Sequence, residues 1–388
     1  MAKQNKPAIR FKGFTDAWEQ RKLGALCVEF KSGDFISASD IAENEAYPVY
    51  GGNGLRGFTN HYNHDGEYAL IGRQGALCGN VNYAVGKSYF TEHAVAVRAN
   101  KTNQTRFLYY LFSTMNLGQY SGQSAQPGLA VGNLVELENV VPSKPEQEKI
   151  ASFLSSLDHL ITLHQRKYDK LQVLKKAMLE KMFPKNGSSV PEIRFKGFTD
   201  AWEQRKLGEV VKEVTRNDPT SEAPIMMITA NNGFIEQSER YAFDNAGESL
   251  KKYILLQKGE LAYNHGASKL RPFGSCFALT TAESARIPFV YHCFSAENQN
   301  AEFLSIELNG SEVESQLRKI VSSGARMDGL LNISFDEYST VTVLLPDIKE
   351  QEHIADFFRN LDHLITLHQR ELEKLQNIKK SMLEKMFV

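Results

Sequence analysis

The sequence has little that would support a covalent framework, a metal site or a membrane span. Its 388 residues include only four cysteines, with no Cys-x-x-Cys pair and no histidine-rich cluster around them, so neither a disulfide network nor a zinc site is indicated. No apolar run approaches the ~20 residues that cross a bilayer, and the first residues contain no hydrophobic signal segment. We therefore expect a cytoplasmic protein without membrane association, with reduced and mostly buried thiols.

The sequence also lacks the motifs of common active sites. It contains no G-x-x-x-x-G-K-[ST] phosphate loop, no G-x-G-x-x-G after a strand and no H-E-x-x-H. Residues 217–220 (Asn-Asp-Pro-Thr) lack the second proline and the aromatic residue expected for methylation of a base amino group. Residues 346–350 resemble a nuclease carboxylate cluster, but their place at a helix start favours capping. We expect no catalytic residue, metal or cofactor in this chain.

An excess of positive charge is missing as well. Lys and Arg number 45 and Asp and Glu 46, which gives a net charge of -1. Residues 25–144 carry 8 basic and 10 acidic side chains, and residues 209–347 carry 12 and 19. Neither segment is basic enough to hold DNA tightly by phosphate neutralisation alone. If the chain reads DNA, we expect partners to supply much of the positive charge and the isolated chain to bind weakly.

What the sequence does contain is an internal duplication. Residues 9–24 and 193–208 are identical (IRFKGFTDAWEQRKLG), and residues 157–166 recur as residues 361–370. Each half therefore has this leading motif, an unlike body and a similar closing stretch. We expect the similar frames to meet a common partner or each other, and the unlike bodies to meet different targets. The predicted parts are the first leading motif (1–24), the first body (25–142), a central long helix (143–185), a connector with the second leading motif (186–208), the second body (209–346) and a C-terminal long helix (347–388).

The closing stretches have the pattern of a coiled coil, because apolar residues recur at spacings of three and four. Ser143 with Glu146, and Asp347 with Glu350, predict matching helix starts. We expect two helices of about 34 residues and roughly 50 Å each, paired antiparallel with pseudo-two-fold symmetry. The first seam also includes Leu174. The principal seam residues are Leu157, Ile161, His164, Leu171, Leu361, Ile365, His368 and Leu375.

Two residue pairs in these frames invite a functional interpretation. His164 and His368 interrupt the two seams at equivalent positions, where a pH switch or a metal pair is conceivable, but a polar residue that fixes helix register is more common. Trp18 and Trp202 are the only tryptophans, each placed in a short helix that begins near Asp16 or Asp200. We expect each indole to anchor its body to the long helices rather than to stack on a ligand.

The bodies have the pattern of mixed, largely β structure, with short apolar runs separated by glycine-rich loops. The loops carry Arg, Asn and Gln, whose planar groups read guanine and adenine edges in a major groove, and glycine lets the backbone approach phosphate. Ordinary turn chemistry also explains each loop taken alone. The candidate DNA-contacting residues are Asn53, Arg56, Arg73, Gln74, Gln123, Gln126, Asn231, Asn232, Asn264, His265, Lys269, Arg271 and Arg326.

Taken together, these features resemble the specificity subunits of type I restriction-modification systems (the HsdS family). The resemblance covers nearly the whole chain. It depends on Trp-x-x-x-Lys-Leu-Gly at 18–24 and 202–208, Glu-Gln-x-x-Ile-Ala at 146–151 and 350–355, and Leu-Asp-x-x-Ile at 157–161 and 361–365. The glycine-rich runs at 50–54 and 70–75 are also similar to the family's. The combination is specific, whereas the runs in the body alone are weak signals.

The resemblance implies an α+β fold with two target-recognition domains on an antiparallel helix pair. Each domain would read one half of a split, asymmetric DNA site, and the helices would fix the gap between the halves at a few base pairs. Two modification subunits with S-adenosylmethionine would methylate adenine, and two restriction subunits would add ATP- and Mg-dependent translocation and cleavage. Two other functions stay open at this point: a self-sufficient methyltransferase or nuclease, and a coiled-coil adaptor that binds only proteins.

Overall fold

The computed structural model of the chain describes residues 6–75, 77–122, 128–185, 187–230, 233–239, 247–321 and 330–388. These residues form two compact units. Unit 1 comprises residues 1–167 and 368–388, and unit 2 comprises residues 168–367. Each unit contains one body and a part of each long helix, so each is described by itself. No helix in the described ranges is long and apolar enough to cross a membrane.

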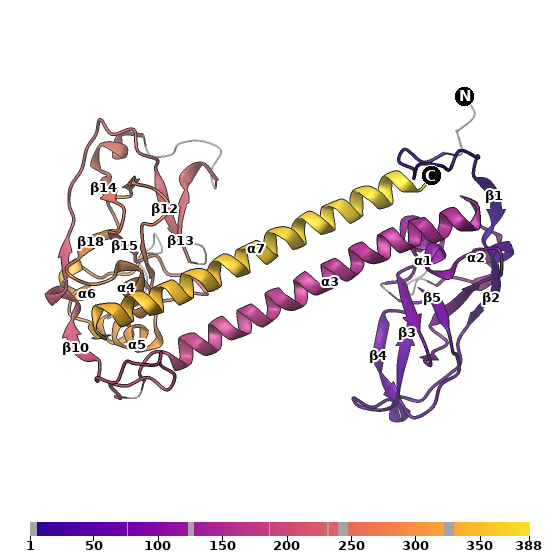
Figure 1. The fold of residues 1–388 in the computed structure, drawn as a ribbon, viewed down its shortest axis with the longest axis horizontal. Helices are drawn as coiled ribbons and strands as arrows, with labels where there is room; N and C mark the ends of the chain where they lie inside the picture. Colours follow the sequence, from indigo (N-terminus) through magenta and orange to yellow (C-terminus); the bar gives the residue numbers. More distant parts are fainter. Residues whose placement is uncertain are drawn as a thin grey trace. The chain divides into compact units, whose positions relative to one another are not determined.

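Unit 1 is built around an antiparallel four-stranded sheet in the order β2-β8-β5-β6. Strands β2 and β5 of this sheet are labelled in Figure 1. A three-stranded sheet in the order β4-β3-β7 and the pair β1-β9 complete its β structure. Helix α1 (Thr105–Thr114) packs against the main sheet, and α2 (Val131–Glu136) follows it in the chain. The strands are β1 (Glu19–Lys22), β2 (Cys27–Ser32), β3 (Tyr47–Gly51), β4 (Gly54–Thr59), β5 (Glu67–Gly72), β6 (Val81–Val85), β7 (Tyr89–Phe90), β8 (Ala94–Ala99) and β9 (Glu138–Val141).

Unit 2 repeats this plan with unrelated residues. Its four-stranded antiparallel sheet has the order β11-β18-β15-β16, and its pair β10-β19 corresponds to β1-β9. Helices α4 (Ala301–Leu308), α5 (Ser311–Ile320) and α6 (Phe335–Tyr338) accompany the sheet. The strands are β10 (Glu203–Lys206), β11 (Val211–Glu213), β12 (Met226–Thr229), β13 (Gly233–Glu236), β14 (Ile254–Gln257), β15 (Leu261–Asn264), β16 (Ser275–Ala278), β17 (Ser284–Ile287), β18 (His292–Ala296) and β19 (Thr342–Leu345).

The two long helices are α3 (Lys144–Lys181, 38 residues) and α7 (Ile348–Met386, 39 residues), both slightly longer than predicted. Asp347 caps α7 as expected, because its Oδ1 accepts hydrogen bonds from the amides of Lys349 (2.9 Å) and Glu350 (3.2 Å). The carboxylates of Glu146 and Glu350, three residues after Ser143 and Asp347, bind arginines.

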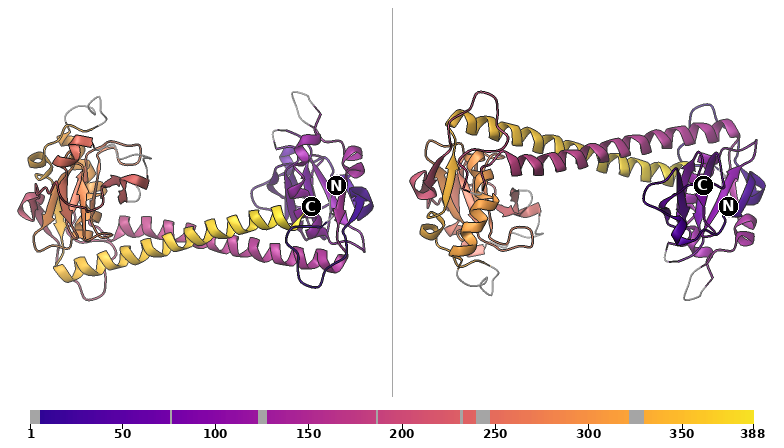
Figure 2. Two further views of the ribbon diagram at one scale, coloured as in Figure 1. Left: turned by 90° about the horizontal axis from the view of Figure 1, so that it is seen from above. Right: turned by 90° about the horizontal axis from the view of Figure 1, so that it is seen from below.

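The helices pack antiparallel in each unit. In unit 1 the end of α7 lies beside the first half of α3 (Figure 2). Lys379 Nζ of α7 contacts Asp158 Oδ1 of α3 at 2.5 Å. In unit 2 the end of α3 meets the start of α7, and Lys175 Nζ contacts Asp362 Oδ1 at 2.5 Å. Of the principal residues of the expected seam, Leu157, Leu361 and Ile365 are buried and the others are partly buried. Leu174 is 41% exposed, so its assignment to the seam is wrong.

The leading motifs differ locally from the predicted short helices. Residues 19–22 form strand β1, which pairs antiparallel with β9, and residues 203–206 form β10, which pairs with β19. A single turn of 3-10 helix follows each strand, at Leu23–Leu26 and Leu207–Glu209. The last strand of each body offers an edge for pairing, and this tertiary contact overrides the local tendency to start a helix.

Both tryptophans anchor their units, as predicted. Trp18 is 2% exposed and makes edge contacts with Phe107 of α1 (ring centroids 6.3 Å apart) and with Phe387 after α7 (6.4 Å). Trp202 makes the same kind of contact with Phe303 of α4 (5.6 Å) and Phe183 after α3 (5.8 Å). Each indole therefore ties its leading motif to the body and to the end of a long helix.

Candidate nucleic-acid interface

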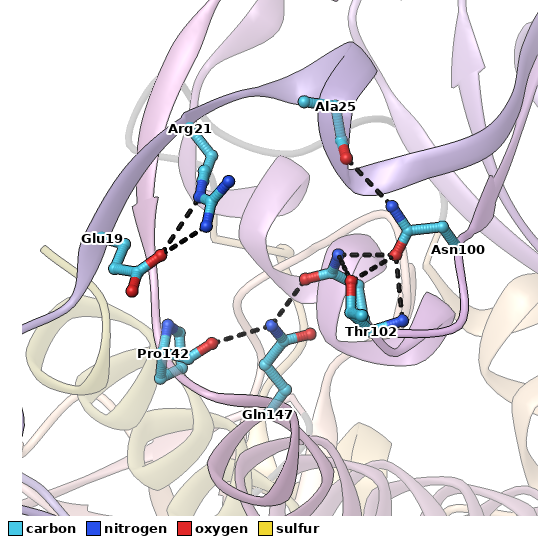
Figure 3. A network of polar contacts seen from close by, with 8 residues as sticks. Glu19, Arg21, Ala25, Asn100, Thr102, Pro142 and Gln147 are labelled. Atoms are coloured by element: carbon cyan, nitrogen blue, oxygen red, sulfur yellow. Dashed lines mark hydrogen bonds and ion pairs between the residues drawn. The ribbon is translucent and has the colours of Figure 1, made fainter.

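Each body is fixed to a long helix through a glutamine in the first turn of that helix. In unit 1, the Gln147 side chain donates to the carbonyl of Pro142 (2.9 Å) and to Oδ1 of Asn103 (2.8 Å), as Figure 3 shows in part. Its Oε1 accepts from the amide of Gln104, the residue that caps α1 (3.0 Å). The same Asn103 side chain is held by Asn100, which also reaches the carbonyl of Ala25. The body is thereby fixed to the frame by directional polar contacts.

Unit 2 uses the equivalent glutamine in the same way. Gln351 donates to the carbonyl of Pro346 (2.9 Å) and to Gln299 Oε1 (2.7 Å), and it accepts from the amide of Asn300 (3.0 Å), which caps α4. Gln147 and Gln351 are each 1% exposed. A shared frame residue therefore holds two bodies of unlike sequence in one local arrangement.

A buried ion pair completes each mount. Arg10 of the first leading motif binds Glu146 through two hydrogen bonds of 2.6 and 2.7 Å, and Arg194 of the second binds Glu350 through two of 2.7 Å. Both glutamate side chains are 1% exposed. The hydrogen bonds to Glu146 raise the pKa of Arg10, as those to Glu350 raise the pKa of Arg194. Two-point geometry makes these charge-assisted bonds directional as well as strong.

In the first body, the structure brings several predicted residues together at one end of the main sheet. Asn53 lies in the exposed turn between β3 and β4, and the exposed Arg56 follows on β4. The backbone of this turn contacts the end of β5: a Cβ atom on Gly72 would lie only 2.2 Å from the carbonyl oxygen of Gly52. The two glycines thus permit the close approach that places Arg73 beside the turn.

Arg73 is fixed beside the turn by two hydrogen bonds, but one of its buried side-chain donors has no partner in the described part of the chain. Its amide donates to the carbonyl of His93 (3.0 Å), and its Nη1 donates to Ser32 Oγ (3.0 Å). Its Nε is buried and has no hydrogen-bond partner among the described residues. Gln74 follows at an exposed position, bridged to Gly128. Gln123 and Gln126, which the sequence assigns to the same surface, lie outside the described residues.

Three polar residues near Arg73 are not among the candidates predicted from the sequence. They are Asn82 on β6, and Glu92 and His93 just before β8. Asn82 adjoins the turn, because a Cβ on Gly54 would lie 3.1 Å from its Oδ1. The signal that could have indicated Glu92 and His93 is their position directly before the apolar run Ala94–Ala99, which pairs with the end of β5.

In the second body, two of the predicted residues serve the interior of the domain. His265 is 7% exposed, and its ring nitrogens contact the carbonyls of Leu331 (Nδ1, 2.7 Å) and Val290 (Nε2, 2.6 Å). Asn264 donates to the carbonyl of Ile228 and accepts from the amide of Gly266. The prediction of a surface role for His265 is corrected here, because both of its polar atoms are engaged inside the protein.

Of the other candidates in the second body, one is exposed and one is bonded within the domain. Lys269 is exposed. Arg271 donates from Nη1 to the carbonyl of Asn309 (2.8 Å), and burial lowers the pKa of its guanidinium. Arg271 therefore ties its loop to Asn309 at the end of α4 rather than projecting freely. Asn231, Asn232 and Arg326 lie outside the described residues. The described part of the second body does not assemble a cluster like that around Arg73.

The helical frame carries two equivalent grooves, one in each unit. The groove of unit 2 has a volume of about 690 Å³ and that of unit 1 about 670 Å³. Seven residues of the first recur, type for type, in the second at a sequence shift of 204. The unit 2 set is Gln172, Lys175, Lys176, Leu179, Glu180, Phe183 and Asp362, and the unit 1 set is Gln376, Lys379, Lys380, Leu383, Glu384, Phe387 and Asp158.

Apolar residues are also exposed at equivalent positions of the long helices. In unit 1, Leu160 and Leu163 of α3 are 40% and 39% exposed. In unit 2, Leu364 and Leu367 of α7 are 42% and 45% exposed. The same two leucine positions are therefore exposed in both copies of the long-helix sequence.

The two seam histidines meet within unit 1. Nδ1 of His164 lies 3.1 Å from Nδ1 of His368, and their rings make an edge contact. Burial, together with the neighbouring His164 and Lys167, lowers the pKa of His368. No group of three or more His, Cys, Asp and Glu side chains that could hold a metal ion occurs in the part of the chain that the structure describes.

Comparisons with known proteins all find specificity subunits of type I restriction-modification systems or their DNA specificity domain. Residues 15–173 match a family described as the type I restriction modification DNA specificity domain. The chain is 45% identical over 146 residues to the EcoprrI type I restriction enzyme specificity subunit of Escherichia coli, which covers 37% of this chain and 36% of that protein. The matched part is thus about a third of the relative's length.

Two longer matches cover more of the chain. One is the MjaVIII type I restriction enzyme specificity subunit of Methanocaldococcus jannaschii, 24% identical over 315 residues, which covers 74% of this chain and 71% of that protein. The other is the crystal structure of the S subunit of a type I restriction-modification system from M. genitalium, with a TM-score of 0.67, 15% identity and 99% of both chains covered. The second likeness establishes a shared fold.

Proposed function

We propose that the chain, which is similar to the specificity subunits of type I restriction-modification systems, selects the DNA sequence for a larger complex and carries out no chemistry itself. Its first body would read one half of a split DNA site and its second body the other half. Because the bodies carry unlike loops, the two half-sites would differ, and the helix pair would set the gap between them. Both adenine methylation and DNA cleavage by the complex would depend on this choice of sequence.

The observation that carries the proposal is the repeated mount. Gln147 and Gln351 make the same contacts, as do the pairs Arg10–Glu146 and Arg194–Glu350, yet the loops that they support differ in sequence. The main sheets also share one strand order. A frame that holds two unlike bodies in the same way suits a protein that reads two different sequences with one geometry.

The grooves and the exposed leucines support docking of two copies of one partner. Seven residues on the long helices recur in both grooves, so one kind of partner could contact the same helix residues in each unit, although body residues also line the unit 2 groove. We assign this role to two modification subunits, which would carry S-adenosylmethionine and supply much of the positive charge that the bodies lack. Two restriction subunits would add ATP, Mg and cleavage, and the assembled complex would act on double-stranded DNA in the cytoplasm.

The proposal is tested by sequencing the methylated motifs of cells that carry this subunit with its modification subunit. We expect one split, asymmetric motif. Insertion of one helical turn into both α3 and α7 is expected to widen the unread gap and leave both halves intact. A continuous motif, or an insertion that alters the bases of both halves, would contradict the proposal.

Docking is tested separately on the assembled complex. The double substitution Leu163→Asp with Leu367→Asp is expected to reduce co-purification of the modification subunit, because it places charge in both repeated apolar surfaces. The control is Val173→Asp, an exposed apolar position (69%) of the same helix as Leu163. Equal loss of binding in control and test variants would show that the leucine pairs are not the docking surface.

A further inference from the structure

The polar cluster around Arg73 in the first body contains an unusual concentration of unsatisfied atoms. Four buried side-chain atoms have no hydrogen-bond partner among the described residues: Arg73 Nε, Asn82 Nδ2, Glu92 Oε2 and His93 Nδ1. Buried polar atoms are paired in the great majority of cases, so unpaired ones require an explanation. A group of donors and acceptors left open at one place is what a polar ligand would satisfy.

The cluster is built by close backbone contacts. The turn with Gly52 touches both Gly72, at the end of β5, and the carbonyl of His93, which would lie 2.9 Å from a Cβ on Gly52. That same carbonyl accepts from the amide of Arg73 (3.0 Å). Side chains of larger volume at the glycines would push these segments apart. The geometry therefore brings a guanidinium and a carboxylate from distant parts of the sequence to one end of the sheet.

The side chains remain accessible although some of their atoms are buried. Glu92 and His93 keep 35% and 42% of their side-chain surface exposed, and the exposed Asn53 and Gln74 border the cluster. Glu92 Oε1 is 3.4 Å from His93 Nε2, which leaves Oε2 as the open acceptor. Ser32 Oγ accepts from Nη1 of Arg73, and no described residue accepts a hydrogen bond from Nη2 or from the buried Nε.

We propose that this cluster reads one G·C base pair in the first half-site through the major groove. The Arg73 guanidinium would donate to guanine O6 and N7, and the Glu92 carboxylate would accept from the cytosine N4 amino group of the same pair. Guanine offers two acceptors at this edge and cytosine one donor, so a donor fork beside a carboxylate matches that pair and no other. This inference rests on the proposed function and adds Glu92, Asn82 and His93 to the reading surface.

The test uses the complex of this subunit with its modification subunit. The variants are Arg73→Lys, which keeps the charge but loses the planar fork, and Glu92→Gln, which keeps the shape but not the pure acceptor. Both are expected to relax the same single G·C position of one half-site. Discrimination at that position should fall about ten- to a hundredfold, measured by binding to duplexes substituted at each base pair in turn. The other half-site and the gap should not change.

The control variant is Arg98→Ala, an exposed arginine of the same domain that lies beside Tyr68 and Gly66, outside the cluster. It should leave the recognised sequence unchanged. Complex assembly, followed by size-exclusion chromatography, identifies variants that fail to fold, in which case Arg73→Gln replaces Arg73→Lys. The inference falls if the two variants relax different positions, an A·T position or none. If the unchanged complex reads no split motif, the proposed function itself fails.

Discussion

The backbone amide of Ile9 donates to the carbonyl oxygen of Lys385 at 2.9 Å, just as the amide of Ile193 donates to the carbonyl oxygen of Lys181 at 2.9 Å. The second contact joins a leading motif to the helix that precedes it in the chain. The first joins the other leading motif to the helix that ends the chain. The order of elements therefore closes on itself.

This closure predicts that the chain tolerates circular permutation. A protein that runs from Ser188 to Val388, continues into Met1 and ends at Gly187 should fold and select the same DNA sequence, because every mount is kept. The methylated motif of cells that carry the permuted subunit checks this. A control that opens the chain inside β5, between Leu70 and Ile71, should not fold. If neither permuted protein folds, the contact between the first leading motif and the end of α7 cannot replace the covalent connection that follows α3.

In the buried pairs Arg10–Glu146 and Arg194–Glu350, removal of one partner should destabilise the protein much more than replacement of both partners by apolar residues. Arg10→Ala leaves the Glu146 side chain, 1% exposed, without its partner and should cost about 3–5 kcal/mol of unfolding free energy. The double change Arg10→Met with Glu146→Leu should cost much less. Urea unfolding measures both.

The control for these variants is Arg21→Ala, which breaks the exposed Glu19–Arg21 contact drawn in Figure 3. Its cost should not exceed about 1 kcal/mol, because both side chains are more than half exposed and water screens the pair. A cost for Arg10→Ala no larger than for Arg21→Ala would show that the buried pair does not hold the mount.

Glu307 of α4 should make unit 2 less stable at alkaline pH. Burial raises the pKa of this carboxyl to about 7, while one backbone amide, that of Leu344, lies 3.0 Å from Oε1. Its folded-state pKa lies above that of the unfolded chain, so stability is complete in acid and is lost as the pH rises through about 7. Glu307→Gln keeps the bond to Leu344 and should add roughly 3 kcal/mol at pH 8.

The gain from Glu307→Gln should shrink as the pH falls towards 5, which thermal unfolding across that range can follow. Glu222→Gln, at an exposed position, is the matched control and should show no such trend. A constant difference between Glu307→Gln and the original chain at all pH values would contradict the account.

The His164–His368 pair should weaken unit 1 in acid. With Nδ1 atoms 3.1 Å apart, one ring must accept a proton that the other donates, so both rings cannot be charged without loss of that bond. Burial and the charges of His164 and Lys167 lower the pKa of His368 below its ordinary 6.5. The unfolded chain therefore binds protons more readily, and stability is lost as the pH falls below 6.5.

Replacement of both histidines by Asn should reduce this loss, so that the variant gains on the original chain between pH 7.5 and 5.5. His159→Asn, at an exposed position of the same helix, is the control. Melting temperatures across this range provide the measurement. If the paired and the exposed replacements change the pH dependence equally, the seam pair is not responsible for it.

The frame was predictable because its signals are local and repeated. Apolar spacing in residues 144–181 and 348–386 predicts long helices whatever surrounds them, and identical motifs predict identical mounts. The buried Arg10–Glu146 contact was not predictable, because nothing local links residues 136 positions apart. Strand β1 was likewise missed, since its partner β9 lies far away in the chain.

The bodies were harder to predict for a different reason. Many different apolar sequences can form the same short strand. The two bodies therefore share one strand order in their main sheets without sharing a recognisable amino-acid sequence. The sequence also does not show which loop residues lie at the surface. Arg73 and Asn53 reach a common surface because Gly52 and Gly72 meet, whereas His265, in an equally glycine-rich loop, turns inward to two carbonyls.

The central claim is that this chain carries two independent readers on one frame. The most direct measurement is the methylated motif of cells in which residues 25–142 are replaced by the corresponding body of another family member, with the frame left unchanged. We predict that one half-site changes completely, while the other half-site and the gap stay as they were. A change in both half-sites, or in neither, would contradict the account.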